Sequence, residues 1–381
     1  MRLQLNMAQR ARRIAVLTIA GALAAAAPAA ADGTLAARDV YYKERATRVM
    51  QPMLDGMFDA GLHGVVVAHF LVDAITSASA SSGAVGSTPF TEHRYEGGAG
   101  YSHKLGPLTI GADGKYSTES DYRSIYFGAH ATLELAQKNT VLGIGGGASF
   151  DTVSAAAAQG PSIPTLRCDA AHPAATRCPL DVYSAYASLS QIVGPNVVVG
   201  LSADIGRLDG FQSNPYRQAI VGTAFEPERH PTERTREAIA ASMRYYITPT
   251  ETTVIGAYRY YTDDWNVHAH TPEFRIIQQA GYDIDATFGY RYYEQSRAYF
   301  YRTRYPADDS ALNGYVSDDV KLSRFTGHTL EAKLGVAGEA FQLRGDWANA
   351  RFEGILEYVI QNNAFGNAVV AHVALTLPFN Y

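Results

Sequence analysis

Apolar and non-apolar positions alternate with a period of two along most of this chain. In residues 282–293 the even-numbered positions are apolar or aromatic, whereas the odd-numbered positions include Asp283, Asp285 and Arg291. Successive side chains of a β-strand point to opposite faces, so this pattern predicts a strand with one apolar face. The final residues, 369–379, show the same alternation. The sequence therefore predicts an all-β protein.

The alternation recurs in segments of about ten residues. We expect about 14 strands, within a range of 12 to 16. They are predicted near residues 65–75, 91–104, 107–117, 123–136, 140–152, 181–193, 196–206, 234–247, 251–262, 266–277, 281–295, 326–337, 351–361 and 367–380. A soluble sandwich would also alternate, so the connections between strands must decide the class of fold.

The predicted connections separate into two kinds. Those on one side are tight turns with the sequences KLG, QKN, GPN, TPT and QAG. Those on the other side include all the long polar loops, residues 76–90, 153–180, 207–233 and 296–325. Short periplasmic turns and long outer loops are typical of a transmembrane antiparallel β-barrel in the outer membrane of a Gram-negative bacterium. Outward aromatic residues near both strand ends fit its two aromatic girdles.

The first 62 residues divide into two segments. Residues 1–31 resemble a cleaved signal peptide, because arginines precede an apolar run and an A-x-A site. Residues 32–62 carry Val49, Met50, Met53 and Leu54 at helical spacing, and we expect a periplasmic or lumenal plug segment there. An extra strand is the alternative, and it would raise the count toward 16. Residues 63–381 form the predicted barrel.

Composition narrows the function classes. The chain has 25 tyrosines and 34 glycines with a mean hydropathy of −0.13, as a β-rich protein requires. Its formal charge of −5 becomes −9 without the four arginines of the signal segment, which argues against nucleic-acid binding. Cys168 and Cys178 share one polar loop of an exported chain, and we expect a local disulfide between them. No pattern predicts a metal site or a cofactor.

Several sequence blocks resemble a known bacterial family. These blocks are YYKERATRV, VDAITSASA, YSTESDYRS, YRYYEQS and DVKLSRF. They look like the recurring blocks of a domain-of-unknown-function family whose members are regarded as outer-membrane β-barrels. The resemblance implies the fold and the compartment, and it supplies no catalytic residues. The C-terminal aromatic residues Phe379 and Tyr381 also resemble the assembly signal of outer-membrane barrels as a class.

Charged residues on the predicted inner face are the candidates for function. They are Arg244, Arg259, Glu273, Arg275, Asp283, Asp285 and Arg291. In each of three Arg-Tyr-Tyr triplets, the arginine and the second tyrosine should point inward. Arg275 is expected to pair with Asp283 or Asp285 across the QAG turn. Such charges could select solutes, as charged rings do in pores, or they could simply cross-link the barrel interior.

A second group of candidates lies at the outer rim. Asp73, Glu119 and Asp121 fall near the outer ends of early strands, where their oxygens could bind a divalent cation or cap turns. No nucleophile or zinc motif indicates an enzyme.

The leading hypothesis is a narrow channel or solute-specific pore with a charged lumen. The alternative is a closed barrel that serves as a docking platform for a periplasmic, lipoprotein or surface partner, and an outer-membrane enzyme is a weaker alternative. Outer-membrane lipids and the barrel-assembly machinery are the expected partners, with a small solute as the ligand.

Overall fold

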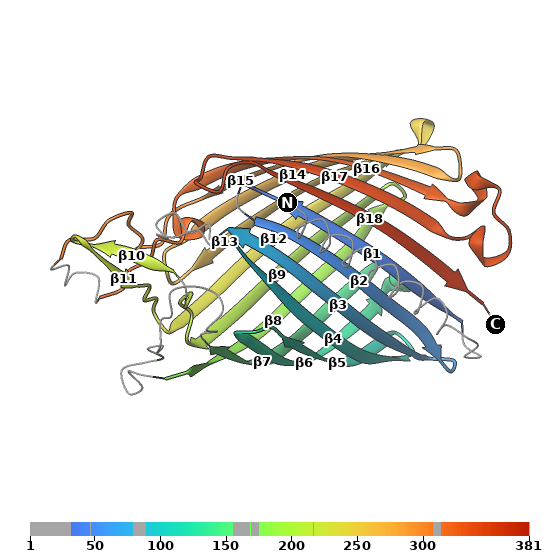
Figure 1. Ribbon diagram of the computed structural model, residues 1–381. Helices are drawn as coiled ribbons and strands as arrows, with labels where there is room; N and C mark the ends of the chain where they lie inside the picture. Colours follow the sequence, from blue (N-terminus) through green and yellow to red (C-terminus); the bar gives the residue numbers. More distant parts are fainter. Residues whose placement is uncertain are drawn as a thin grey trace, which may run out of the picture.

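The computed structural model describes residues 32–45, 47–78, 89–154, 168, 175–215, 217–307 and 314–380. Its main feature is one closed barrel of 16 antiparallel strands, drawn from the side in Figure 1. The predicted signal segment 1–31 and the terminal Tyr381 lie outside the described residues. None of the described helices is long and apolar enough to span a membrane.

The first half of the barrel consists of nine strands. They are β1 (Gly33–Lys43), β2 (Thr47–Ala60), β3 (Gly64–Ala78), β4 (Pro89–Leu105), β5 (Leu108–Thr118), β6 (Tyr122–Leu135), β7 (Thr140–Ser154), β8 (Arg177–Gly194) and β9 (Val197–Gly210). Each pairs with its neighbour in sequence, and β1 also pairs with the last strand to close the barrel.

The second half consists of seven strands. They are β12 (Glu233–Ile247), β13 (Thr252–Asp263), β14 (His268–Ala280), β15 (Ile284–Gln295), β16 (Phe325–Ala337), β17 (Arg351–Gln361) and β18 (Ala368–Phe379). A separate hairpin, β10 (Gln218–Val221) with β11 (Ala224–Pro227), lies in the connection from β9 to β12. All 14 predicted strands are therefore present, and the total of 16 lies at the upper end of the expected range.

The prediction of a plug in residues 32–62 is wrong. Most of this segment forms β1 and β2, which lie in the barrel wall between β18 and β3. The helical spacing was misleading because β2 is apolar on both faces. Val49, Met53 and Met57 share the inward parity with Asp55, while Leu54 and Phe58 share the outward parity. Phe58 packs against Phe379 on the outer surface of the barrel.

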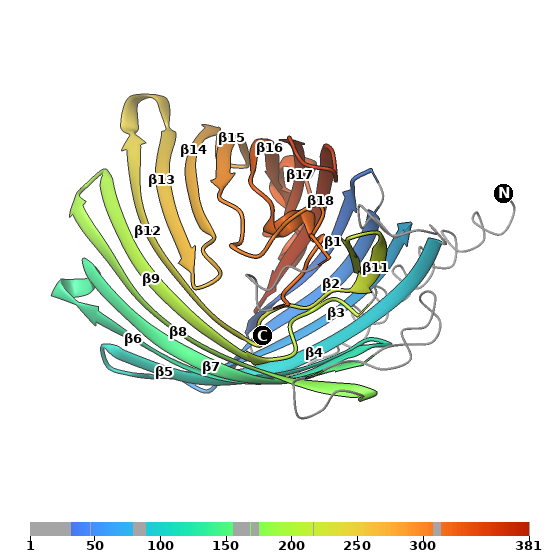
Figure 2. The same ribbon diagram turned by 90° about the vertical axis from the view of Figure 1, so that its left-hand side faces the viewer.

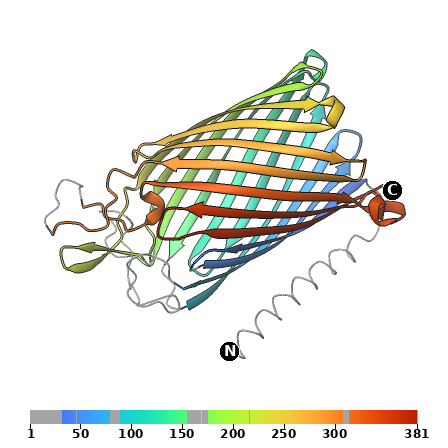
Figure 3. The same cartoon turned by 90° about the horizontal axis from the view of Figure 1, so that it is seen from above.

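The two ends of the barrel differ in their connections. At the end where β18 terminates, the turns are short, and Gly106 and Gly281 adopt left-handed φ values of 62° and 69° there. The exception is residues 338–350, which form the 3-10 helices η5 (Gly338–Phe341) and η6 (Gly345–Trp347), visible beside the C-terminus in Figure 3. All the other long connections lie at the opposite end. We call the end with the short turns, where β18 terminates, the inner end, and we call the opposite end the outer end.

The three clusters of buried apolar residues in the described part of the chain lie at the outer end. The described residues of the segments 211–232, 264–267 and 296–324 pack against one another beyond the strand ends, and we call them the outer cap. Figures 1 and 2 show β10, β11 and the neighbouring segments over part of the barrel mouth. Phe300 and Ala298 are fully buried there beside Trp265, and Tyr305 packs with Ala219 and Val316.

The outward face of the strands is apolar over its inner half. Side chains such as Phe288, Leu356 and Ile144 are more than half exposed in the isolated chain, as lipid contact requires. By the strand registers, every outward Asp, Glu, Lys or Arg of the described strands lies in the outer half. The apolar band therefore begins at the inner turns, and the outer strand ends extend past it.

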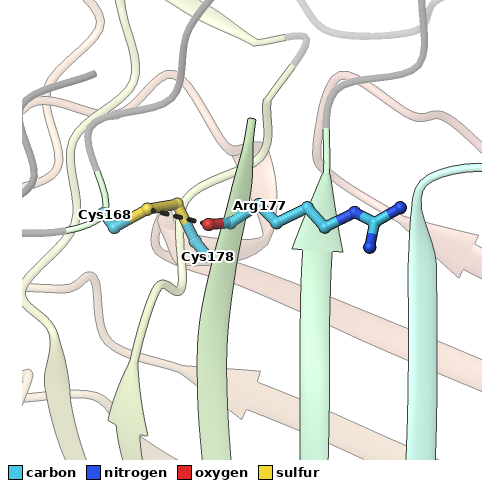
Figure 4. The surroundings of a disulfide bond; sticks show 3 residues. All are labelled: Cys168, Arg177 and Cys178. Atoms are coloured by element: carbon cyan, nitrogen blue, oxygen red, sulfur yellow. Dashed lines mark hydrogen bonds between the residues drawn. A yellow bond between two sulfur atoms is a disulfide. The ribbon is translucent and has the colours of Figure 1, made fainter. Parts of the chain in front are cut away.

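A disulfide joins Cys168 to Cys178 at the outer end, where β8 begins (Figure 4). Cys178 is completely buried, and both sulfur-bearing residues pack with Val153 and Phe211. The bridge thus ties the β7 to β8 connection to the start of β8.

Candidate functional site: the charged inner wall

The strand registers give one face of every strand to the barrel interior. In β12, β13 and β15 the inward positions include Arg244, Arg259 and Arg291. The second tyrosine of each Arg-Tyr-Tyr triplet shares this parity, and the first tyrosine has the outward parity. The barrel thus has the inward and outward assignment that the alternation predicts for these triplets.

The three triplet arginines differ in their contacts. Arg259 lies 3.5 Å from Asp204 of β9 and stacks near the ring of Tyr261. Arg244 and Arg291 have no ion-pair partner among the described residues. The inner wall formed by β12 to β15 therefore carries positive charge that the described carboxylates do not pair.

The predicted partner of Arg275 is wrong. Arg275 pairs with Glu273 at 2.5 Å and with Glu331 at 3.2 Å. The register places Arg275 opposite Gly289, whereas Asp285 stands opposite Gln279, four residues away along β14. Four residues span about 13 Å in a strand, so the two side chains do not meet. Asp283 lies in the turn before β15, and its carbonyl accepts a hydrogen bond from Ala337.

Glycine makes the long reach of Arg275 possible. A Cβ on Gly289 would lie 3.3 Å from Arg275 Cγ and 3.1 Å from Glu331 Cβ. The missing side chain of β15 thus lets an arginine of β14 contact a glutamate of β16. A Cβ on Gly335 would similarly meet the guanidinium of Arg351, which pairs with Asp285 across β16. Both glycines clear the inner surface where two charged side chains meet.

Further ion pairs connect β15 to β17. Arg351 pairs with Asp285 and Glu353, and Lys333 lies 2.6 Å from the same Glu353. These ion pairs and those of Arg275 with Glu273 and Glu331 together form one charged region of the inner wall. We call it the β14–β17 network, and it consists of Glu273, Arg275, Asp285, Glu331, Lys333, Arg351 and Glu353.

A second network crosses the first five strands. Arg38 of β1 pairs with Asp55 of β2, and Asp55 lies 2.6 Å from His69 of β3. His69 and Lys115 each lie 3.6 Å from Glu96 of β4. We call these five residues the β1–β5 network. Each contact joins adjacent strands, so this chain of polar contacts crosses the wall at right angles to the strands.

Most residues of the two networks were not among the predicted candidates, for identifiable reasons. Arg38 and Asp55 belong to the segment that was predicted to be a plug. Lys333 and Arg351 have inward parity on predicted strands, and that parity was a usable signal. Their partners could not be assigned, because the irregular connection 338–350 leaves the register between β16 and β17 open.

The outer-rim carboxylates separate into two groups. Asp73 pairs with Arg94 of β4 at 2.9 Å. Glu119 and Asp121, in the β5 to β6 turn, meet Glu92 instead, and their ligand oxygens lie within 4.8 Å of one another. This spacing fits one divalent cation bound by oxygen ligands. Burial, followed by repulsion from Glu92 and Asp121, raises the pKa of Glu119 to about 7.

Sequence comparison identifies the family. A family model described as "Protein of unknown function (DUF3570)" matches residues 18–364. The chain belongs to the DUF3570 family. The match covers all of β1 to β17 and the outer cap, so the barrel and its cap are features of a DUF3570 protein. No curated protein sequence matches this DUF3570 chain.

Three solved structures align with this DUF3570 protein, and the first of them supports its fold. A structure titled "Bacterial polysaccharide outer membrane secretin" aligns over 93% of this chain and 100% of its own, with a TM-score of 0.53 and 8% identity. Acinetobacter baumannii OccAB1 aligns over 92% of this chain and 96% of its own, with a TM-score of 0.48 and 11% identity. Pseudomonas aeruginosa OccD3 aligns over 92% and 91%, with a TM-score of 0.46 and 9% identity. At 8% identity the similarity to the first structure is one of fold alone.

Proposed function

We propose that this protein is an outer-membrane channel that admits small solutes through a charged lumen. The observation that carries the proposal is the combination of a closed 16-stranded wall with ion-pair networks and unpaired arginines on its inner face. Known barrels of 16 strands enclose an aqueous channel, whereas eight-stranded barrels are filled by side chains. Charged side chains facing such a channel set its ion selectivity.

The inner wall is charged unevenly, and this favours anionic solutes along one side. Within the β14–β17 network the carboxylates and cations largely pair with one another. Arg244 and Arg291 add positive charge that no described carboxylate pairs, and Arg259 has only a 3.5 Å contact with a half-exposed Asp204. We infer that a solute carrying a carboxylate or phosphate would travel along β12 to β15.

Planar-bilayer recording of the refolded protein tests this function. Wild-type protein is expected to form discrete conductance steps with a reversal potential that indicates anion preference. Replacing Arg259 and Arg291 with Glu should shift the reversal potential toward cation preference, because two inward charges change sign. The matched control, Arg297→Glu with Arg304→Glu, makes the same charge change in the outer cap and should have a smaller effect.

Two results would count against the channel. Folded protein that never conducts would exclude it, and an equal shift in the control would exclude Arg259 and Arg291 from the selective region. If the folded protein never conducts, the folded outer cap favours the alternative function, a docking platform. A cap with its own buried core provides a rigid outer surface, so a barrel without conductance is best explained as a docking platform.

A further inference from the structure

The turn between β1 and β2 places like charges side by side at the outer end. Lys43 ends β1 and Arg48 lies near the start of β2, and the two are direct partners in the antiparallel register. Both have outward parity and both are exposed. Arg45 adds a third positive charge in the turn itself. Like charges directly opposite each other in a sheet destabilise the pairing.

No described residue neutralises this group. Lys43, Arg45 and Arg48 have no ion pair within the described part of the chain. Glu44, the carboxylate of the same turn, instead accepts a 2.6 Å hydrogen bond from the hydroxyl of Tyr42, which has inward parity. Elsewhere on the outward face the protein does provide a partner, since Arg207 lies 2.9 Å from Glu233. The basic turn is therefore left to be neutralised from outside.

The surface directly below the basic turn is apolar. Tyr41 and Met50 are the next outward residues of β1 and β2, and they are paired in register. Val369 of β18 stands beside Lys43 on the same face. A ligand in this place meets positive charge at the strand ends and then the side chains of Tyr41, Met50 and Val369, which lie above Asp39, the next outward residue of β1. A phosphorylated lipid has this order of groups, with the anion above the acyl chains.

We propose that Lys43, Arg45 and Arg48 bind a phosphate group of an outer-leaflet glycolipid. A guanidinium forms paired hydrogen bonds with phosphate oxygens, and the lysine ammonium adds a compact charge. The phosphate converts an unfavourable like-charge pair into two favourable contacts, while the acyl chains lie along Tyr41, Met50 and Val369. This lipid site requires that the outer end faces the outer leaflet, and it does not require that the barrel conducts.

Native mass spectrometry of the full chain in detergent tests the site, with bisphosphorylated lipid A as the probe. The double variant Lys43→Gln with Arg48→Gln should weaken lipid A binding at least tenfold. The matched control, Arg297→Gln with Arg304→Gln, removes two outer cap charges and should change binding less than twofold. Exchanging the two cations, Lys43→Arg with Arg48→Lys, keeps both charges and should retain binding. Heat-dependent gel mobility checks that each variant folds.

Thermal unfolding is a second measurement, and the removal of the two cations should affect thermal stability differently without and with lipid A. Without lipid A, the Lys43→Gln and Arg48→Gln double variant should unfold at the same or a higher temperature than wild type, because it lacks the repulsive pair. With lipid A, the wild type should gain thermal stability and the variant should gain little. A merely structural role for the two cations predicts a less stable variant in both conditions.

Three results would overturn the proposal. The first is equal weakening in the double variant and in the control. The second is undiminished binding of lipid A from which both phosphates have been removed. The third is equal stabilisation of the wild type by millimolar inorganic phosphate, which would assign the basic turn to a free anion and not to a lipid.

Discussion

In the barrel wall the large apolar side chains point away from the protein, whereas in the outer cap they point toward one another. Phe288 of β15 is 63% exposed, while Phe300, only 12 residues later, is fully buried. Both segments are rich in aromatic residues, so composition does not separate them. The two regions differ in their surroundings. Lipid surrounds the wall and takes the place of a protein core for its apolar side chains, whereas water surrounds the cap.

Polar groups follow the opposite arrangement. In the wall, ionised side chains face the interior and pair across neighbouring strands, as Arg38 does with Asp55. In the cap, an ionised group lies in the core itself. The Glu228 side chain has no exposed surface, and it lies 3.2 Å from His230 and 3.7 Å from Arg217. Backbone hydrogen bonding closes the wall, and side-chain packing closes the cap.

Truncating the cap core should produce the largest effect. Phe300→Ala removes a fully buried ring that touches Trp265, Tyr299 and His230, and such changes cost about 3–5 kcal/mol. We expect rapid proteolysis within the cap, while the barrel keeps its heat-dependent gel mobility. Phe288→Ala, the matched change in the wall, should leave cap proteolysis unchanged. Loss of the barrel in Phe300→Ala would show that the two regions unfold together.

Neutralising the buried charge of the cap should have the next largest effect. Glu228→Gln keeps the shape but leaves His230 and Arg217 without their shared carboxylate, at a cost of about 3 kcal/mol to the cap. Hydrogen exchange of the cap amides measures this loss. The exposed Glu226→Gln, which breaks only the pair with Arg229, should cost less than about 1 kcal/mol.

The same variant has a defined pH dependence. Burial raises the pKa of Glu228, but His230, Arg217 and the hydroxyl of Ser317 together lower it to about 2. A carboxyl whose pKa is depressed in the folded state stabilises that state above its unfolded pKa of about 4.5, and the contribution is lost as the pH falls toward 2. The difference between wild type and Glu228→Gln should therefore shrink as the pH falls below 4. A constant difference down to pH 2 would contradict this linkage.

The wall could be predicted from the sequence because strand alternation is a local pattern. The packing of the cap could not be predicted. Residues 282–292 reveal their outward face within one segment, and the segregation of short and long connections then gives the orientation. Phe300, Trp265 and Ala219 come from three connections without periodicity, so their burial depends on how those connections meet. The prediction for the segment that forms β2 was wrong for a local reason, since Met53 and Met57 place apolar side chains on the inward face.

The functional residues show the same limit. Inward parity identified Arg244, Arg259 and Arg291, because it depends only on each strand. The partner of Arg275 depended on register and on the absence of a side chain at Gly289, two features that a single strand does not contain. For the same reason Glu92 was not predicted to join Glu119 and Asp121, since it comes from β4, 27 residues before Glu119.

The rim above β4 to β6 lies between wall and cap, and it should give the smallest effect. The pKa of Glu119 is raised to about 7, so this carboxyl binds its proton more tightly in the folded state than in the unfolded state. Wild-type stability should therefore fall as the pH rises from about 4.5 to 7. Glu119→Gln cannot ionise, so it should match wild type near pH 4, below the unfolded pKa, and exceed it at pH 8. Because Glu119 is partly solvated, we expect a stability difference of less than about 1 kcal/mol, measured as the difference in urea midpoints.

Asp346→Asn removes a carboxylate at the inner end and serves as the control. A Glu119→Gln variant that is less stable than wild type at pH 8 would show that the three carboxylates attract a cation strongly enough to offset their repulsion.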